Sequence, residues 1–232
     1  MIVRDAQLEW VRRPLQARSQ QTLDRLLDAA EALLDEQGLE KITVAEVARR
    51  ADSSVGAFYT RFADKEGLVR LVLERFTEQA IATTEAVLLP ERWNGVPVAD
   101  ALETMLLFTL KIVRERRRLI AALIVRSAQD PTLTALGEQL HEHICEHMRA
   151  LVAARGDRFT HEDPDTAIHV AVGMVLSFVE SRAIHHAERL TDERMATEMA
   201  RLIVGYLGVD TTHKQKRTNG HKRRALRSER EE

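Results

Sequence analysis

Cysteine is almost absent from the 232-residue sequence, in which Cys145 is the single one. A disulfide framework within the chain is therefore excluded, and a reducing cytoplasm is the expected compartment. Proline and glycine are also scarce, with 5 and 10 residues. Because both residue types interrupt helices, their scarcity favours an all-α chain.

An excess of one charge and long apolar runs are lacking as well. The formal net charge is −2, so any binding to nucleic acid must depend on local charge. The longest apolar run, from Val170 to Val179, is interrupted by Ser177 and is shorter than the roughly 20 residues that cross a bilayer. The N-terminus lacks the basic-then-apolar pattern of a signal peptide. We therefore expect no membrane partner.

The residue patterns of common active sites are also missing. The sequence contains no nucleophile–base arrangement, no glycine-rich phosphate loop and no paired-carboxylate motif. Acidic residues are spread over helix faces, as expected of solvated charge. We therefore expect no enzyme activity and no cofactor.

The stretch from Thr43 to Phe62 is instead rich in local signals. Thr43 is a good N-cap, and Glu46 lies three residues later, which completes a capping box. Asp52 interrupts the helical pattern and tolerates a left-handed backbone better than most residues. Either Ser53 or Ser54 then begins a second helix as its N-cap. The pattern predicts a helix-turn-helix, whose second helix enters the major groove of DNA.

Helical placement divides this second helix into two sides. Phe58 and Phe62 point inward as anchors. Tyr59 and Lys65 can reach phosphates, and the helix start at Thr43 presents free backbone N–H groups to another phosphate. Small side chains nearest the base edges let the helix sit deep, and an arginine can pair with guanine. The predicted DNA-binding residues are Thr43, Ser54, Val55, Gly56, Ala57, Tyr59, Thr60, Arg61 and Lys65.

The two last predicted helices, at about Asp165 to Glu188 and Thr191 to Gly208, suit assembly. The first is apolar nearly all round, so it must be buried on more than one side. Paired with their symmetry mates, the two helices would form a four-helix bundle about a two-fold axis. The predicted interface residues of this homodimer are Ala167, Ala171, Gly173, Met195, Met199, Ile203 and Tyr206.

The segment HEHICEH, from His141 to His147, contains the residue types of a metal site. His141 and Cys145 share one helical face, and His143 and His147 share another. Because the two faces diverge, no tetrahedral site uses all four, and a third ligand must come from another helix. The options for this ligand are His169, His185 and His186. We expect a polar helix face with one buried thiol, and no metal.

Several of these motifs together resemble the TetR family of transcriptional regulators. The resemblance covers residues 18–72 and lies in Gly38, the run ITVAEVARRA, Ser54-x-Gly56, Phe58-Tyr59, Phe62 and the run DKEGL. It implies an all-α protein with an N-terminal three-helix DNA-binding domain and a C-terminal helical domain for ligand binding and dimerisation. It further implies a homodimeric repressor that a small-molecule effector releases from its operator.

We accordingly divide the chain into four segments. Residues 1–17 form a flexible basic arm, 18–72 the helix-turn-helix domain, 73–210 the effector-binding and dimerisation domain, and 211–232 a disordered basic tail. The arm and the tail either contact DNA or are only solvated. The candidate pocket residues are Met105, Phe108, Ile112, Leu123, Arg126, Met174, Phe178 and Glu180. The alternative is a helical ligand-binding or protein-interaction module without sequence-specific DNA binding.

Overall fold

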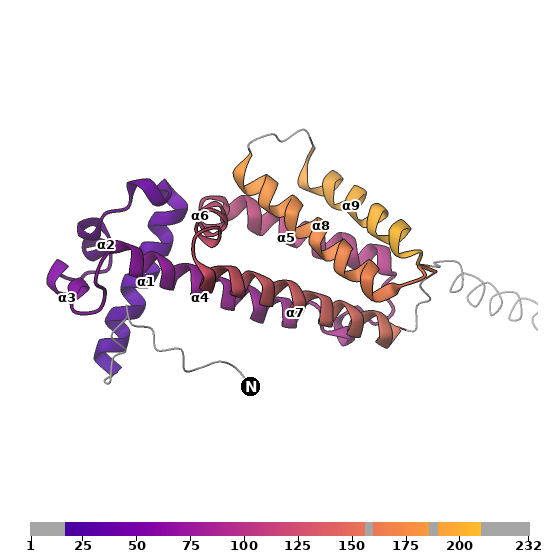
Figure 1. Cartoon of the computed structure of the whole chain (residues 1–232), viewed down its shortest axis with the longest axis horizontal. Coiled ribbons are helices and arrows are strands. Elements are labelled where there is room, and N and C mark those ends of the chain that lie inside the picture. The colour runs from indigo at the N-terminus through magenta and orange to yellow at the C-terminus, as the bar shows by residue number, and fades with distance from the viewer. Residues whose placement is uncertain (1–16, 156–159, 186–189, 210–232) are drawn as a thin grey trace, which may run out of the picture. The chain divides into compact units, whose positions relative to one another are not determined.

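A computed structural model describes residues 17–155, 160–185 and 190–209 (Figure 1). These residues form α-helices and short 3-10 turns without a strand, which confirms the all-α prediction. The helices are α1 (Ala17–Gln37), α2 (Val44–Arg50), α3 (Val55–Tyr59), α4 (Lys65–Val87), α5 (Val98–Glu115), α6 (Arg117–Ser127), α7 (Pro131–Arg155), α8 (Pro164–Ile184) and α9 (Asp192–Leu207). The basic tail and all of the basic arm except its last residue lie outside the described residues.

The chain forms two compact units. The described residues of unit 1 fall in 17–82, 112–140 and 178–185, and those of unit 2 in 83–111, 141–155, 160–177 and 190–209. The helices α4, α5, α7 and α8 contribute residues to both units. Neither unit is continuous in sequence, and the division of the chain after residue 72 stays a prediction.

The core of unit 1 forms around α1, against which α2 and α6 pack (Figure 1). Leu26 and Leu34 on α1 are fully buried, and Phe58 and Leu119 join them from α3 and α6. Gly38 ends α1 with a φ of 80° and a ψ of 169°, a positive-φ conformation that glycine adopts without strain. Two helices as short as α2 and α3 cannot bury enough apolar surface alone, so this core holds the helix-turn-helix in place.

Arginines at the junction of α5 and α6 bind the C-terminal part of α1. Arg116 forms ion pairs with Glu31 and Asp35, and Arg118 donates to the backbone carbonyls of Asp35 and Glu36. Burial by itself would raise the pKa of Glu31, but hydrogen bonds from Arg116 and Arg75 hold the pKa below its ordinary value. This basic cluster therefore stabilises unit 1 from within.

The helices α8 and α9 supply much of the apolar surface of unit 2. By length and composition, α8 is the helix among the described residues that could cross a membrane, although only 28% of its most apolar window is buried in the chain. Ala167 and Ala171 are buried, while Val170 and Met174 are exposed. Short-range bonds define α9: Thr191 accepts from the backbone N–H of Arg194 at 3.3 Å. One side of α8 therefore packs within its own chain and the other is uncovered.

Candidate nucleic-acid interface

The first half of the helix-turn-helix has the predicted capping geometry. The hydroxyl of Thr43 accepts a hydrogen bond from the backbone N–H of Glu46 at 3.2 Å and begins α2. Asp52 has a φ of 48°, the left-handed turn conformation expected of it. Of the two serines considered for the second cap, Ser54 is the N-cap, because its hydroxyl accepts from the backbone N–H of Ala57 at 3.0 Å.

The inward side of α3 is anchored by aromatic residues. Phe58 and Phe62 are 0% and 1% exposed, with ring centroids 5.2 Å apart. The Tyr59 ring meets Phe58 edge to face at 5.3 Å, yet its side chain is 55% exposed. This contact orients Tyr59 while its surface stays accessible.

The outward side of α3 carries small or uncharged residues. Val55 is 42% exposed, and Gly56 and Thr60 are also exposed. A Cβ built on Gly56 would meet only the Ser54 hydroxyl, at an ordinary 3.8 Å. Internal packing therefore does not require glycine at this position. Ala57 and Lys65 are half-buried, the latter in the first turn of α4.

The sequence suggests that the guanidinium of Arg61 is free to pair with guanine. In the structure this group instead forms hydrogen bonds within the chain. Its Nη1 donates to the carbonyl of Ala57 at 2.8 Å and to the Thr60 hydroxyl at 3.1 Å. Its Nη2 donates to the Ser19 hydroxyl on α1 at 3.1 Å. The physical reason is that α1 offers oxygen acceptors within reach of the end of α3. Arg61 thus ties α3 to α1.

The candidate pocket residues do not share one environment. Met105 belongs to the core of unit 2 with Ala101 and Leu151, whereas Leu123 packs against the core of unit 1. Arg126 forms an ion pair with Glu66 at 2.5 Å. Phe108, Met174 and Glu180 are exposed, and Ile112 and Phe178 are half-buried. These residues therefore remain a prediction for the effector site.

Arg126 also lines a cavity of about 330 Å³ within unit 1. Its lining includes four further charged side chains, namely Asp64, Glu66, Arg70 and Asp130. Sequence reasoning missed this cavity because its walls come from α4, α6 and the start of α7, which lie far apart in the sequence.

The predicted dimer residues divide into covered and uncovered sets. Ala167, Ala171 and Ile203 are at most 5% exposed within the single chain, and a Cβ on Gly173 would meet the His141 ring at 3.5 Å. Met195 and Met199 are half-buried. Tyr206 is 40% exposed. The large exposed apolar side chains of α8 and α9 are Val170, Met174, Leu202 and Tyr206 in unit 2, with Ile184 at the end of α8 in unit 1.

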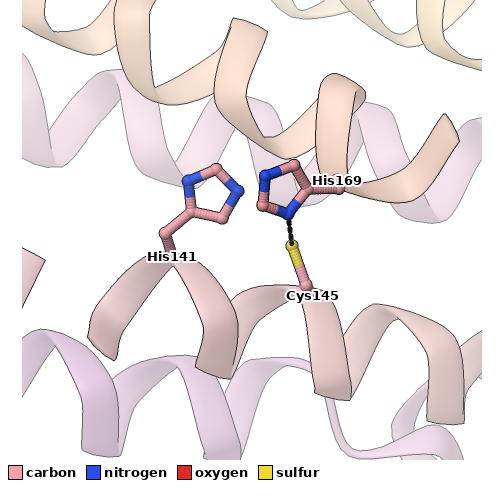
Figure 2. A group of neighbouring side chains, drawn as sticks. All are labelled: His141, Cys145 and His169. Atoms are coloured by element: carbon pink, nitrogen blue, oxygen red, sulfur yellow. Dashed lines mark hydrogen bonds between the residues drawn. The ribbon is translucent and has the colours of Figure 1, made fainter. Parts of the chain in front are cut away.

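The histidine segment acquires a third member from α8. Figure 2 shows His141 and Cys145 on α7 with His169 opposite them. The other predicted pair lies apart, with His147 bonded to the His143 carbonyl at 2.9 Å. Among the remaining options His185 belongs to unit 1 and His186 lies outside the described residues.

Comparisons with known proteins agree with this arrangement. A family model described as bacterial regulatory proteins, tetR family, matches residues 26–72. A second, described as tetracyclin repressor-like, C-terminal domain, matches residues 97–207. Between them the two models cover the helix-turn-helix and most of the chain that follows it.

Two curated relatives and a solved structure are similar over different lengths. The A-factor receptor protein of Streptomyces griseus is 37% identical over 62 residues, which are 27% of this chain and 22% of that protein. The HTH-type transcriptional regulator AcrR of Shigella flexneri is 28% identical over 129 residues, 55% of this chain and 59% of that protein. The chain thus spans less than two thirds of either relative.

A TetR-family regulator structure from Mesorhizobium loti matches with a TM-score of 0.67 at 20% identity, covering 84% of this chain and 100% of that one. With both family models matched in order along one helical fold, the chain belongs to the TetR family of bacterial regulatory proteins.

Proposed function

We propose that the protein is a transcriptional regulator that binds an operator in duplex DNA, acts as a repressor and is not an enzyme. The observation that carries the proposal is the two-sided α3, with Phe58 buried beneath an exposed face of Val55, Gly56 and Tyr59. A short helix that is anchored by a buried aromatic side chain and carries small side chains on its exposed side suits insertion into the major groove. The tetracyclin repressor-like C-terminal model supports the repressor assignment.

The proposed DNA contacts fall into two groups: those that position the protein on the phosphates and those that read the bases. Tyr59, Lys65 and the capped helix start at Thr43 would hold phosphates. Val55, Ala57 and Thr60 would meet base edges, with apolar contact to thymine methyl groups. Gly56 would let the α3 backbone approach the groove closely, since no neighbour in the chain occupies that space.

We further propose a homodimer formed through α8 and α9. A helix-turn-helix monomer reads too few base pairs to be selective, so two copies should bind half-sites roughly 34–36 Å apart. The uncovered apolar side chains Val170, Met174, Leu202 and Tyr206 support this surface. The buried Ala167, Ala171 and Ile203 would let the helices pack closely beneath it.

A small-molecule effector completes the proposal. One relative is named as a receptor, the A-factor receptor protein, and the match to the C-terminal family model suggests an equivalent role here. Such a ligand must bind the conformation that does not bind DNA more tightly, because otherwise it shifts no equilibrium. A regulator of this kind would act in the cytoplasm, where the operator is.

The DNA-binding proposal is tested by selection from a random duplex library with the purified chain. We expect one short enriched sequence, bound with a Kd of about 10⁻⁸ M or tighter. Lys65→Ala should weaken binding to all sequences alike and reduce the salt slope by about 1. Lys111→Ala on α5 is the control, because it removes an exposed lysine outside the interface. Absence of any enriched sequence would contradict the regulator assignment and favour the interaction-module alternative.

The dimer proposal is tested by sedimentation. The wild-type chain should be a dimer at micromolar concentration, and Met174→Glu should give monomers because a charge would enter an apolar seam. Val125→Glu is the matched control: Val125 is 55% exposed on α6, outside the proposed surface. A monomeric wild-type chain, or a dimeric Met174→Glu variant, would refute this interface.

A further inference from the structure

A cluster of one thiol and two imidazoles lies between α7 and α8 in unit 2, outside the proposed DNA-binding residues (Figure 2). His141 and Cys145 are one helical turn apart on α7, and His169 faces them from α8. The possible ligand atoms of the three residues all lie within 4.8 Å of one another. The Cys145 Sγ and His169 Nδ1 atoms are 3.9 Å apart, and the His141 and His169 ring centroids are 4.4 Å apart.

The bonding of these groups within the chain is poor. Cys145 is fully buried, and its contact with His169 is a weak sulfur hydrogen bond at the limit of its range. The Nε2 atom of His141 is buried without a hydrogen-bond partner. Burying an imidazole nitrogen without a hydrogen-bond partner carries a desolvation cost, so the arrangement is unfavourable unless something else binds there.

We propose that His141, Cys145 and His169 form a transition-metal site that takes Zn²⁺ or a cation of similar softness. Thiolate and imidazole together select such metals over magnesium or calcium, which prefer oxygen ligands. Metal bonds of about 2.3 Å to sulfur and 2.0–2.1 Å to nitrogen place tetrahedral ligand atoms about 3.6 Å apart for S···N and about 3.4 Å apart for N···N. The distance of 3.9 Å between Cys145 Sγ and His169 Nδ1 is close to the S···N value. Modest rotation of the side chains would shorten the remaining ligand-to-ligand distances to these values.

The site would have three protein ligands and one open position. The neighbouring histidines do not compete for it, since His143 lies 3.5 Å from Glu85 and His147 bonds to the backbone. Burial raises the pKa of the Cys145 thiol, with Glu142 acting in the same direction and Arg149 opposing. Because only the thiolate ligates a metal, coordination releases the thiol proton to solvent. A bound metal would join α7 to α8 within unit 2.

Titration with Co²⁺ and then Zn²⁺ tests the site on the untagged, metal-free full chain. We expect one Co²⁺ per chain with a thiolate-to-metal charge-transfer band, and displacement of that band by one equivalent of Zn²⁺. Cys145→Ser should abolish the band. His169→Gln should weaken binding at least about 100-fold, since loss of even an outer-shell partner costs about 10–100-fold. His147→Gln is the matched control on the same helix and should bind like wild type.

A thermal measurement separates ligation from folding. Zn²⁺ should raise the thermal midpoint of the wild-type chain and of His147→Gln, but not that of His169→Gln. His169 is exposed, so this variant keeps the test decisive even if replacement of the buried Cys145 prevents folding. The proposal is overturned if the wild-type chain binds no stoichiometric metal, or if His169→Gln binds it unchanged. Neither measurement involves DNA, so failure here leaves the proposed function untouched.

Discussion

The helices α3 and α8 both present apolar side chains to solvent, but the signals that define them differ in kind. α3 has five residues, a serine cap and a buried Phe58, so its inner and outer sides are distinguished within one turn. α8 has 21 residues, is apolar nearly all round and contains no periodic polar stripe. Short-range hydrogen bonds and the buried Phe58 orient α3. For α8, the side that is buried is determined by the helices that pack against it. A third helix, α4, buries the carboxyl of Glu74 together with apolar residues such as Val72 and Leu73.

The largest expected effect comes from removing the anchor of α3. Phe58→Ala should lower the free energy of unfolding by about 3–5 kcal/mol, since a fully buried phenyl ring leaves a cavity. Val55→Ala on the exposed side should change it by less than about 0.5 kcal/mol. Chemical denaturation measures both. Equal effects of the two substitutions would break the contrast between the sides of α3.

A pH-dependent effect should come from α4. Burial raises the pKa of Glu74 to about 7, with Arg70 opposing and Asp130 and Glu78 adding to the shift. Because this lies above the unfolded value of about 4.3, the folded chain binds more protons between the two values. The contribution of Glu74 is therefore full below about pH 4 and is lost as the pH rises through about 7.

Glu74→Gln tests this sign, because the amide is neutral at every pH. The variant should gain stability relative to wild type as the pH rises from 5 to 8, by on the order of 1–2 kcal/mol after discounting for residual solvent screening. Denaturation at several pH values measures it. Glu40→Gln, at an exposed glutamate between α1 and α2 that does not contribute to the Glu74 shift, is the control and should show no such trend. A constant difference between Glu74→Gln and wild type would show that the carboxyl is already charged at pH 5.

The cap of α3 should have a smaller effect. Ser54→Ala removes the acceptor of the Ala57 N–H and should cost about 1 kcal/mol. Ser53→Ala, one position earlier, is the control and should be close to neutral, because Ser53 is not the cap. Thermal unfolding of both variants measures the difference. A larger loss of stability with Ser53→Ala than with Ser54→Ala would indicate that α3 begins one residue earlier. It would also contradict the view that the Ser54 cap orients α3.

The smallest stability effect, with the opposite sign, concerns Gly56. Gly56→Ala should raise stability by about 0.5–1 kcal/mol through helix propensity, because the added methyl group meets no close neighbour. If Gly56 faces the DNA groove, the same methyl group should weaken operator affinity by a factor of about 3 to 10. Gly137→Ala, at an equally open position on α7, should gain stability without changing affinity. Unchanged affinity in Gly56→Ala would remove this residue from the interface.

The agreement between sequence and structure is closest where bonds connect near neighbours. The Thr43 cap and the left-handed conformation of Asp52 both follow from interactions within three or four residues. Arg61 shows the limit of such reasoning. Its position on the outer part of α3 suggested base contact, but its bond to Ser19 depends on α1, which is 42 residues away.

The sequence by itself determined the all-α fold, the ends of the helices around the turn and, through its motifs, the TetR family. The helices and their ends depend on backbone hydrogen bonds and caps that form locally, and the family is shown by the motif residues themselves. Only the tertiary structure decided which histidine joins His141 and Cys145, and which side of α8 remains uncovered. Nothing in a helical repeat specifies what a side chain on another helix will face. That choice follows from packing, where burial and ion pairs between distant segments outweigh local preference.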